Sequence, residues 1–213
     1  MWKGQLVTLL LVAASALLVI FQAGCSNSKE EKVLTQAERI EKGKYLVELG
    51  GCNDCHSPKV MTDMGPVPDT TRLLSGHPQD QPVMNVDPAM LSSKMWLHAT
   101  MDATAWIGPW GVSYTQNLTP DPETGLGNWT EDLFIKALRT GKHMGIGRPI
   151  LPPMPWPGIG KSSDEDLKNI FAYLHSIPAI HNKVPDPITP DMVGSILSKD
   201  DSKGNVVKAK DMQ

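Results

Sequence analysis

One five-residue motif restricts how this chain can fold more than any other feature of its sequence. It is Cys52-Asn-Asp-Cys55-His56, in which two thiols lie three residues apart and an imidazole follows the second thiol directly. On a tight turn, thiols at this spacing can reach the two vinyl groups at one edge of a haem, and the adjacent imidazole can bind its iron. We therefore expect one covalent haem c, held by Cys52 and Cys55, with His56 as the proximal iron ligand.

Two other uses of paired cysteines fit the sequence less well. A structural zinc site needs four ligands, and the remaining cysteine, Cys25, lies at the end of an apolar N-terminal segment. A thioredoxin-like motif needs a strand before it and a helix after it. Here a predicted helix precedes the motif, and Ser57-Pro58 follows it. Haem attachment is therefore favoured over zinc binding and over thiol redox chemistry.

A second axial ligand has to be chosen from many methionines and histidines. A methionine sulfur favours ferrous iron and raises the reduction potential into the range of electron carriers. We expect Met154, because it lies in Ile150-Leu-Pro-Pro-Met-Pro-Trp-Pro157, where prolines stiffen the backbone. His143 and Met144 are rivals beside glycines in the same loop. The other methionines of the central region and the other histidines are expected to pack, to form hydrogen bonds or to lie at the surface; they are Met61, Met64, Met84, Met90, Met95, Met101, His77, His98, His175 and His181.

The N-terminal segment is typical of an export signal. Lys3 is followed by the apolar run Leu6–Phe21 and then by Gln22-Ala-Gly-Cys25. The Ala-Gly-Cys ending resembles a bacterial lipoprotein signal, which implies cleavage before Cys25 and lipidation of its thiol. The alternative is an uncleaved transmembrane anchor, because about 18 apolar residues can span a bilayer. Both interpretations place the rest of the chain on the periplasmic side of a bacterial membrane.

Three helices can be predicted from their start and stop signals. The first and third start signals fit capping boxes, in which a Ser or Thr and a Glu three residues later cap each other's backbone N–H groups. The third helix also carries apolar residues at helical spacing, among them Leu167, Ile170, Phe171 and Leu174. The start signals are Thr35-Gln-Ala-Glu38, Trp129-Thr130 and Ser162-Ser163-Asp-Glu165, and the stop signals are Gly50-Gly51, Gly141 and Pro178.

The remaining parts of the chain show no lasting helical period. Residues 57–127 are rich in Pro, Gly and Met, and residues 106–117 fit a short strand. We expect an ordered, mostly irregular insertion that packs over the haem. The tail begins Pro-rich and ends polar, so we expect it to be extended or disordered. The predicted division is a signal peptide over 1–24, a lipid-anchored spacer over 25–33, a haem domain over 34–184 and a tail over 185–213.

Charge and motif content exclude several functions. The formal net charge is −3, so the chain has no electrostatic reason to bind nucleic acid. We find no Ser/His/Asp set, phosphate-binding loop or paired acid–base residues that indicate independent catalysis. The sequence therefore favours a carrier of a redox cofactor over an enzyme.

Several segments together resemble class I cytochrome c domains, most closely those of cytochrome subunits of periplasmic dehydrogenases. The resemblance covers residues 34–184 and implies an all-α class I cytochrome c fold with 57–127 as an insertion. In that fold the first and last helices cross closely, which implies that Gly43 meets Tyr173. Besides the haem motif, the resemblance rests on Gly43-Lys-Tyr-Leu-Val47, Asn117-Leu-Thr-Pro-Asp121, Gly125-Leu-Gly127 and Pro152-Pro-Met-Pro-Trp156.

The resemblance implies an electron carrier. A haem with His56 and Met154 as axial ligands would shuttle electrons between donor and acceptor redox proteins, tethered to the membrane by lipid on Cys25. One alternative is a haem enzyme or gas sensor with an open distal site. Another is an obligate electron-transfer subunit of a dehydrogenase or oxidase complex. Multihaem subunits of that kind repeat the whole module, whereas this chain carries one Cys-x-x-Cys-His motif.

Overall fold

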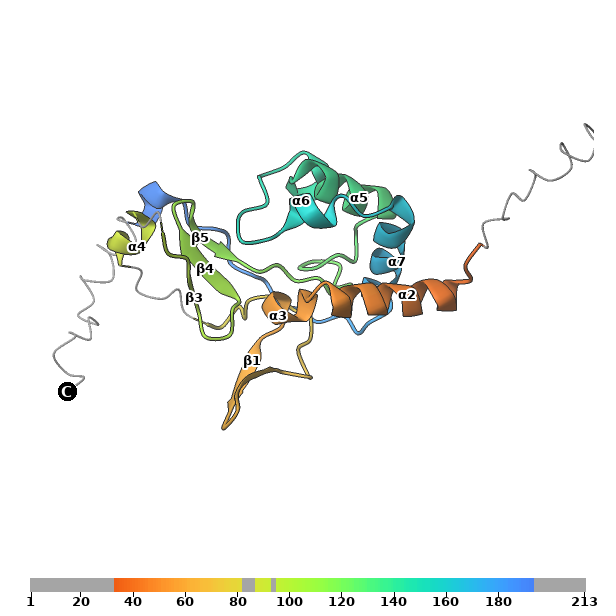
Figure 1. Ribbon diagram of the computed structural model, residues 1–213, viewed down its shortest axis with the longest axis horizontal. Coiled ribbons are helices and arrows are strands. Elements are labelled where there is room, and N and C mark those ends of the chain that lie inside the picture. Colours follow the sequence, from red (N-terminus) through yellow and green to blue (C-terminus); the bar gives the residue numbers. More distant parts are fainter. Residues whose placement is uncertain (1–32, 82–86, 93–94, 194–213) are drawn as a thin grey trace, which may run out of the picture. The chain divides into compact units, whose positions relative to one another are not determined.

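The computed structural model describes residues 33–81, 87–92 and 95–193 (Figure 1). Within these residues, helices pack around one apolar core and short antiparallel strands pack around a second. The elements are α2 (Gln36–Leu49), α3 (Cys52–His56), β1 (Lys59–Thr62), β2 (Gly65–Pro68), α4 (Pro88–Ser92), β3 (His98–Ala99), β4 (Ala105–Gly108), β5 (Gly111–Tyr114), α5 (Glu131–Thr140), the 3-10 turn η1 (His143–Gly145), α6 (Trp156–Ile159) and α7 (Asp164–Leu174).

Helix α2 delivers the cysteine motif. The Thr35 side chain accepts the backbone N–H of Glu38 at 3.3 Å, and the Glu38 carboxylate accepts the backbone N–H of Thr35 at 2.9 Å. The predicted capping box is thus confirmed. The helix is capped by Gly50, and Gly51 then takes a left-handed conformation (φ 63°), which costs glycine little. The chain can therefore turn at once into α3.

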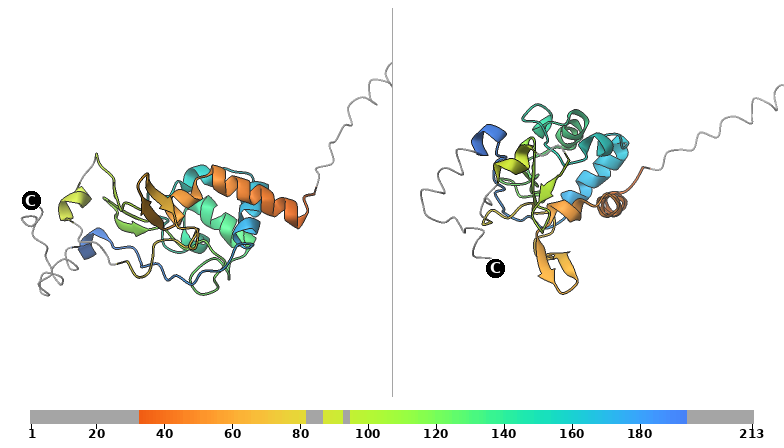
Figure 2. Two further views of the ribbon diagram at one scale, coloured as in Figure 1. Left: turned by 90° about the horizontal axis from the view of Figure 1, so that it is seen from below. Right: turned by 60° about the vertical axis from the view of Figure 1, so that its left-hand side comes forward.

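Helix α7 crosses α2 closely, and the two lie side by side in the views of Figures 1 and 2. A Cβ on Gly43 would lie 1.9 Å from the Asn169 backbone oxygen and 2.8 Å from Tyr173 Cβ, so the crossing requires glycine. The predicted meeting of Gly43 with Tyr173 is confirmed. The cap of α7 is Ser163, whose Oγ accepts the Asp166 N–H at 3.0 Å, one residue later than the predicted capping box.

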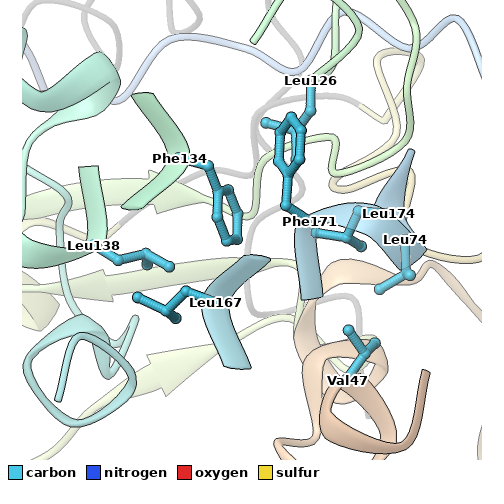
Figure 3. Packing of buried hydrophobic residues seen from close by; sticks show 8 residues of the cluster. All are labelled: Val47, Leu74, Leu126, Phe134, Leu138, Leu167, Phe171 and Leu174. Atoms are coloured by element: carbon cyan, nitrogen blue, oxygen red, sulfur yellow. The ribbon is translucent and has the colours of Figure 1, made fainter. Parts of the chain in front are cut away.

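Helix α5 completes the helical part of the fold. Thr130 accepts the Leu133 N–H at 3.2 Å at its start, and Gly141 ends it in a left-handed conformation (φ 65°), so both predicted signals are confirmed. The rings of Phe134 and Phe171 lie 5.5 Å apart between α5 and α7. The first core, shown in Figure 3, consists of Val47, Leu74, Leu126, Phe134, Leu138, Leu167, Phe171 and Leu174.

The prediction of an all-α fold is wrong, because the insertion contains two antiparallel sheets. Strands β1 and β2 form a hairpin that extends away from the helices (Figures 1 and 2), and β3, β4 and β5 form a sheet in that order. Gly111 has a φ of 96° and allows the tight turn between β4 and β5. Each strand has four residues or fewer, which is too short for a clear alternating pattern. The expected strand within 106–117 is confirmed.

The second core joins the insertion to the C-terminal part of the chain. Val112 and Ile188 exchange two backbone hydrogen bonds of 2.8 and 3.0 Å, which extends the sheet beyond β5. The core consists of Ala105, Val112, Tyr114, Ile188 and Val193. Ile188 and Val193 of the predicted tail are therefore packed into this core with Val112 and Tyr114.

The N-terminal predictions and the end of the predicted tail fall outside the described residues. These predictions are the signal peptide, the lipid anchor at Cys25 and most of the spacer, together with residues 194–213. Among the residues that the structure describes, no helix has the length and apolar character needed to cross a membrane.

Candidate functional site

The two thiols of the motif lie on one helix, α3, one turn apart. Residues three apart on a helix share a face, so Cys52 and Cys55 point to the same side. Both are free and half-buried, and burial raises the pKa of each thiol. Cys52 also packs against the first core. The pair is thus available for covalent attachment from one direction.

The imidazole of His56 is held in one tautomer by a backbone group. Its Nδ1 lies 2.7 Å from the Gln116 carbonyl oxygen. A carbonyl can only accept, so Nδ1 carries the proton and donates it, and Nε2 keeps its lone pair. Burial lowers the pKa of His56 and favours the neutral ring. A neutral imidazole oriented by a second group in this way is the usual form of a metal-binding histidine.

The C-terminal end of α3 is fastened by three further contacts. The His56 carbonyl accepts the Gly76 N–H at 2.7 Å, and the buried Ser57 hydroxyl accepts the Leu74 N–H at 2.8 Å. The Lys59 ammonium donates to the carbonyl of Asp54 at 2.5 Å. The contacts of Gly76 and Lys59 satisfy carbonyls at the end of α3 that intrahelical bonds leave without partners.

Met154 reaches the same core as the cysteine motif. Its side chain is half-buried and packs against the first core, as Cys52 does. The carbonyl of Pro152 in the same loop accepts a hydrogen bond from Ser113 Oγ at 2.7 Å. Beyond the loop, Trp156 packs tightly on Gly141, where a Cβ would lie 2.4 Å from the indole. The stiff loop is therefore held from two sides.

The rival ligands have other surroundings. His143 lies edge-on to Trp129, with ring centroids 5.2 Å apart, and Met144 is exposed. His77 is buried and bonded to Thr104, and His175 Nε2 lies 3.0 Å from the Leu126 carbonyl oxygen. These hydrogen bonds are those expected of structural histidines.

Two contacts of the site were not predicted from the sequence. Gln116 acts through its backbone carbonyl, so its side-chain type carries no signal. Ser113 is one serine in a short strand, and only the pairing of that strand could have indicated that it faces the Met154 loop. Both residues lie in or just after β5.

The donor set fits a covalently attached haem. It offers two free thiols on one helical face, an imidazole whose Nε2 lone pair is available, and a thioether in contact with the same core. Cys52 and Cys55 would hold such a group, and His56 and Met154 are the candidate axial ligands.

Comparison with known proteins finds cytochrome subunits of dehydrogenases. The chain is 36% identical over 107 residues to the cytochrome c subunit of alcohol dehydrogenase (quinone) of Gluconobacter oxydans strain 621H, covering 46% of this chain and 22% of that protein. It is 29% identical over 152 residues to the cytochrome c subunit of gluconate 2-dehydrogenase of Pantoea cypripedii, covering 71% of this chain and 26% of that protein. With the fructose dehydrogenase cytochrome subunit of Gluconobacter japonicus the identity is 39% over 66 residues, covering 31% and 13%.

These relatives confirm the predicted resemblance to cytochrome c subunits of dehydrogenases. The chain spans about a quarter or less of the length of each of these three relatives. No family model matches it.

Proposed function

We propose that this protein is an electron carrier in which one haem c is bound covalently to Cys52 and Cys55. His56 and Met154 are the axial ligands of its iron. The hydrogen bond from His56 Nδ1 to the Gln116 carbonyl carries the proposal, because it leaves Nε2 free beside two unpaired thiols. The haem supplies one-electron chemistry at its iron, and the protein supplies ligands and burial that set the potential.

A carrier agrees with the site better than an enzyme or a gas sensor. Chemistry on a small molecule needs an open iron position, whereas the Met154 loop is stiffened by prolines and anchored by Ser113. The relatives are named as cytochrome subunits of dehydrogenases. The chain therefore passes electrons between redox proteins and performs no reaction of its own.

Substitution of Met154 tests the ligand set. The oxidised wild-type protein is expected to show the near-infrared charge-transfer band of methionine bound to ferric haem. Met154→Ala keeps the covalent haem, loses the band and has a lower reduction potential. Met144→Ala is the matched control and keeps the band. A band that persists in Met154→Ala would contradict the assignment.

A second candidate function is that of an obligate subunit. Exposed apolar side chains on the β1–β2 hairpin favour it, since Met64 is 98% exposed and Met61 is 61% exposed. The hairpin begins shortly after α3, so a protein docked there would lie close to the haem site. Purification from detergent-solubilised membranes tests this role, and Met61→Ser with Met64→Ser is expected to release a dehydrogenase partner. Retention of the partner would count against it.

We also propose that the chain is anchored through lipid on Cys25, on the periplasmic side of a bacterial membrane. The support is the order of Lys3, an apolar run and Ala-Gly-Cys25 at the N-terminus. Mass spectrometry of the purified protein is expected to find an acylated N-terminal Cys25. An intact segment 1–24 would instead indicate an uncleaved transmembrane anchor.

A further inference from the structure

We propose that Ser113 is a positioning residue for the Met154 side of the iron, and that β5 and the residues after it orient both axial ligands. The proposal rests on the proposed function above, since it concerns how the His56 and Met154 ligands are held. It gives the insertion a role in ligand geometry.

The Met154 loop has few hydrogen-bond donors of its own. Pro152, Pro153 and Pro155 have no backbone N–H, so the loop cannot form a regular ladder with a neighbouring segment. Among the described residues, residues 151–154 make one hydrogen bond to the rest of the chain, from Ser113 Oγ to the Pro152 carbonyl. That carbonyl lies two residues before Met154. The Ser113 hydroxyl therefore fixes the backbone from which the methionine side chain extends.

The Ser113 hydroxyl is itself held in one orientation. Ser113 is buried, with 6% of its surface exposed. The Trp110 indole Nε1–H donates to Ser113 Oγ at 3.2 Å, which occupies one lone pair of the hydroxyl and leaves its proton for Pro152. Because a buried hydroxyl with both partners in place is costly to reorient, the contact is well defined.

The same segment reaches the other ligand three residues later. The Gln116 carbonyl accepts the His56 Nδ1–H at 2.7 Å. Between the two contacts, the Thr115 backbone N–H donates to the Thr104 backbone carbonyl at 2.9 Å, and the Thr115 carbonyl accepts the His77 backbone N–H at 2.9 Å. Residues 113–116 are thus bonded on both sides, so the two ligand contacts keep a fixed spacing along one rigid segment.

Competition for the iron tests the proposal. In Ser113→Ala the loop loses its anchor, so Met154 dissociates more readily and an external ligand such as cyanide binds ferric haem more tightly. Loss of one neutral hydrogen bond predicts about a fivefold gain in cyanide affinity and a weaker methionine–iron band. Exchange of the Ile150 amide, which donates to the Gly141 carbonyl at 2.8 Å, is expected to quicken, whereas exchange in α5 is unchanged.

Three variants separate positioning from general destabilisation. Ser113→Thr keeps the hydroxyl and is expected to keep the wild-type cyanide affinity. Ser75→Ala is the matched control for loss of a buried hydroxyl, since Ser75 is 1% exposed and its Oγ donates to the Arg72 carbonyl at 2.8 Å, not to the Met154 loop or to the Gln116 carbonyl. Trp110→Phe removes the donor to Ser113 and is expected to raise cyanide affinity less than Ser113→Ala does. If Ser113→Ala does not accumulate, the comparison of Trp110→Phe with Ser113→Thr decides, and equal affinities overturn the proposal.

The outcomes also distinguish this proposal from the ligand assignment. If Met154→Ala loses the near-infrared band while Ser113→Ala behaves like Ser75→Ala in affinity, band and exchange, only the role of Ser113 is overturned. If Met154→Ala keeps the band, the ligand assignment is overturned and the role of Ser113 with it.

Discussion

His56 is half-buried and His77 is buried, and their hydrogen bonds give the two histidines different chemistry. His56 donates from Nδ1 to a carbonyl and keeps Nε2 available as a ligand. The Thr104 hydroxyl donates to Asp102, so it accepts from His77 Nδ1. The Nε2 of His77 is buried without a hydrogen-bond partner in the described part of the chain. The ring is therefore neutral, and burial lowers the pKa of His77, although nearby Asp102 acts to raise it.

This lowered pKa predicts how stability depends on pH. Above about pH 6.5, the folded and unfolded forms both hold His77 neutral. As the pH falls below that value the unfolded chain binds a proton that the buried ring does not, so the free energy of unfolding decreases. The slope from this residue is at most about 1.4 kcal/mol per pH unit, the limit for one proton.

Denaturant titrations of wild type and His77→Gln between pH 5 and pH 8.5 measure this contribution. The two stability curves are expected to run parallel above pH 7.5 and to converge as the pH falls towards 5, because the variant lacks the group that titrates. Parallel curves over the whole range would show that His77 contributes nothing to the pH dependence.

At the scale of elements, the closest approach in the fold is the crossing of α2 and α7. Gly43→Ala would gain helix propensity of about 1 kcal/mol, but its Cβ would lie 1.9 Å from the Asn169 carbonyl oxygen, a backbone atom. We expect a net loss of roughly 2 kcal/mol or more in the free energy of unfolding, measured by chemical denaturation. Gly158→Ala in α6 is the matched control, since nothing lies within 4 Å of its added Cβ. If both variants change the free energy of unfolding equally, the close crossing does not require glycine at position 43.

The elements also show what the sequence alone can and cannot predict. Helices α2 and α5 were predicted with both end signals because Thr35, Thr130 and Gly141 act on backbone groups a few residues away. The start of α7 was one residue off because two serines stand together there. Strand β5 also has a pairing partner at Ile188, far along the chain. Pairings of this kind leave little local signal, so the insertion was expected to be irregular.

The residues of the candidate site also divide into those with a local sequence signal and those without one. The haem motif and the Pro-rich Met154 loop were found from sequence because their chemistry is local. The groups that orient them were not found, because the Gln116 carbonyl is common to every residue type and the contact of Ser113 crosses 39 residues.

At the scale of the whole described unit, the second core ties the C-terminal segment to the insertion. Ile188 is 7% exposed and packs with Val112 and Tyr114. Ile188→Ala is expected to reduce the free energy of unfolding by about 2 to 4 kcal/mol, and to quicken amide exchange in β5. Met61→Ala on the exposed hairpin should change the free energy of unfolding by about 0.5 kcal/mol or less. A small effect at Ile188 would mean that residues 185–193 contribute little to the fold.

The distance along the chain between the motif and its supports also sets an order in time. A polypeptide is made from its N-terminus, and the Gln116 carbonyl follows His56 by 60 residues. At ordinary rates of synthesis this is roughly 3 to 12 seconds of elongation. Ile188, which pairs with Val112 of β5, is made later still. The newborn chain therefore presents its two thiols and a freely rotating imidazole well before the segment that orients the ring exists.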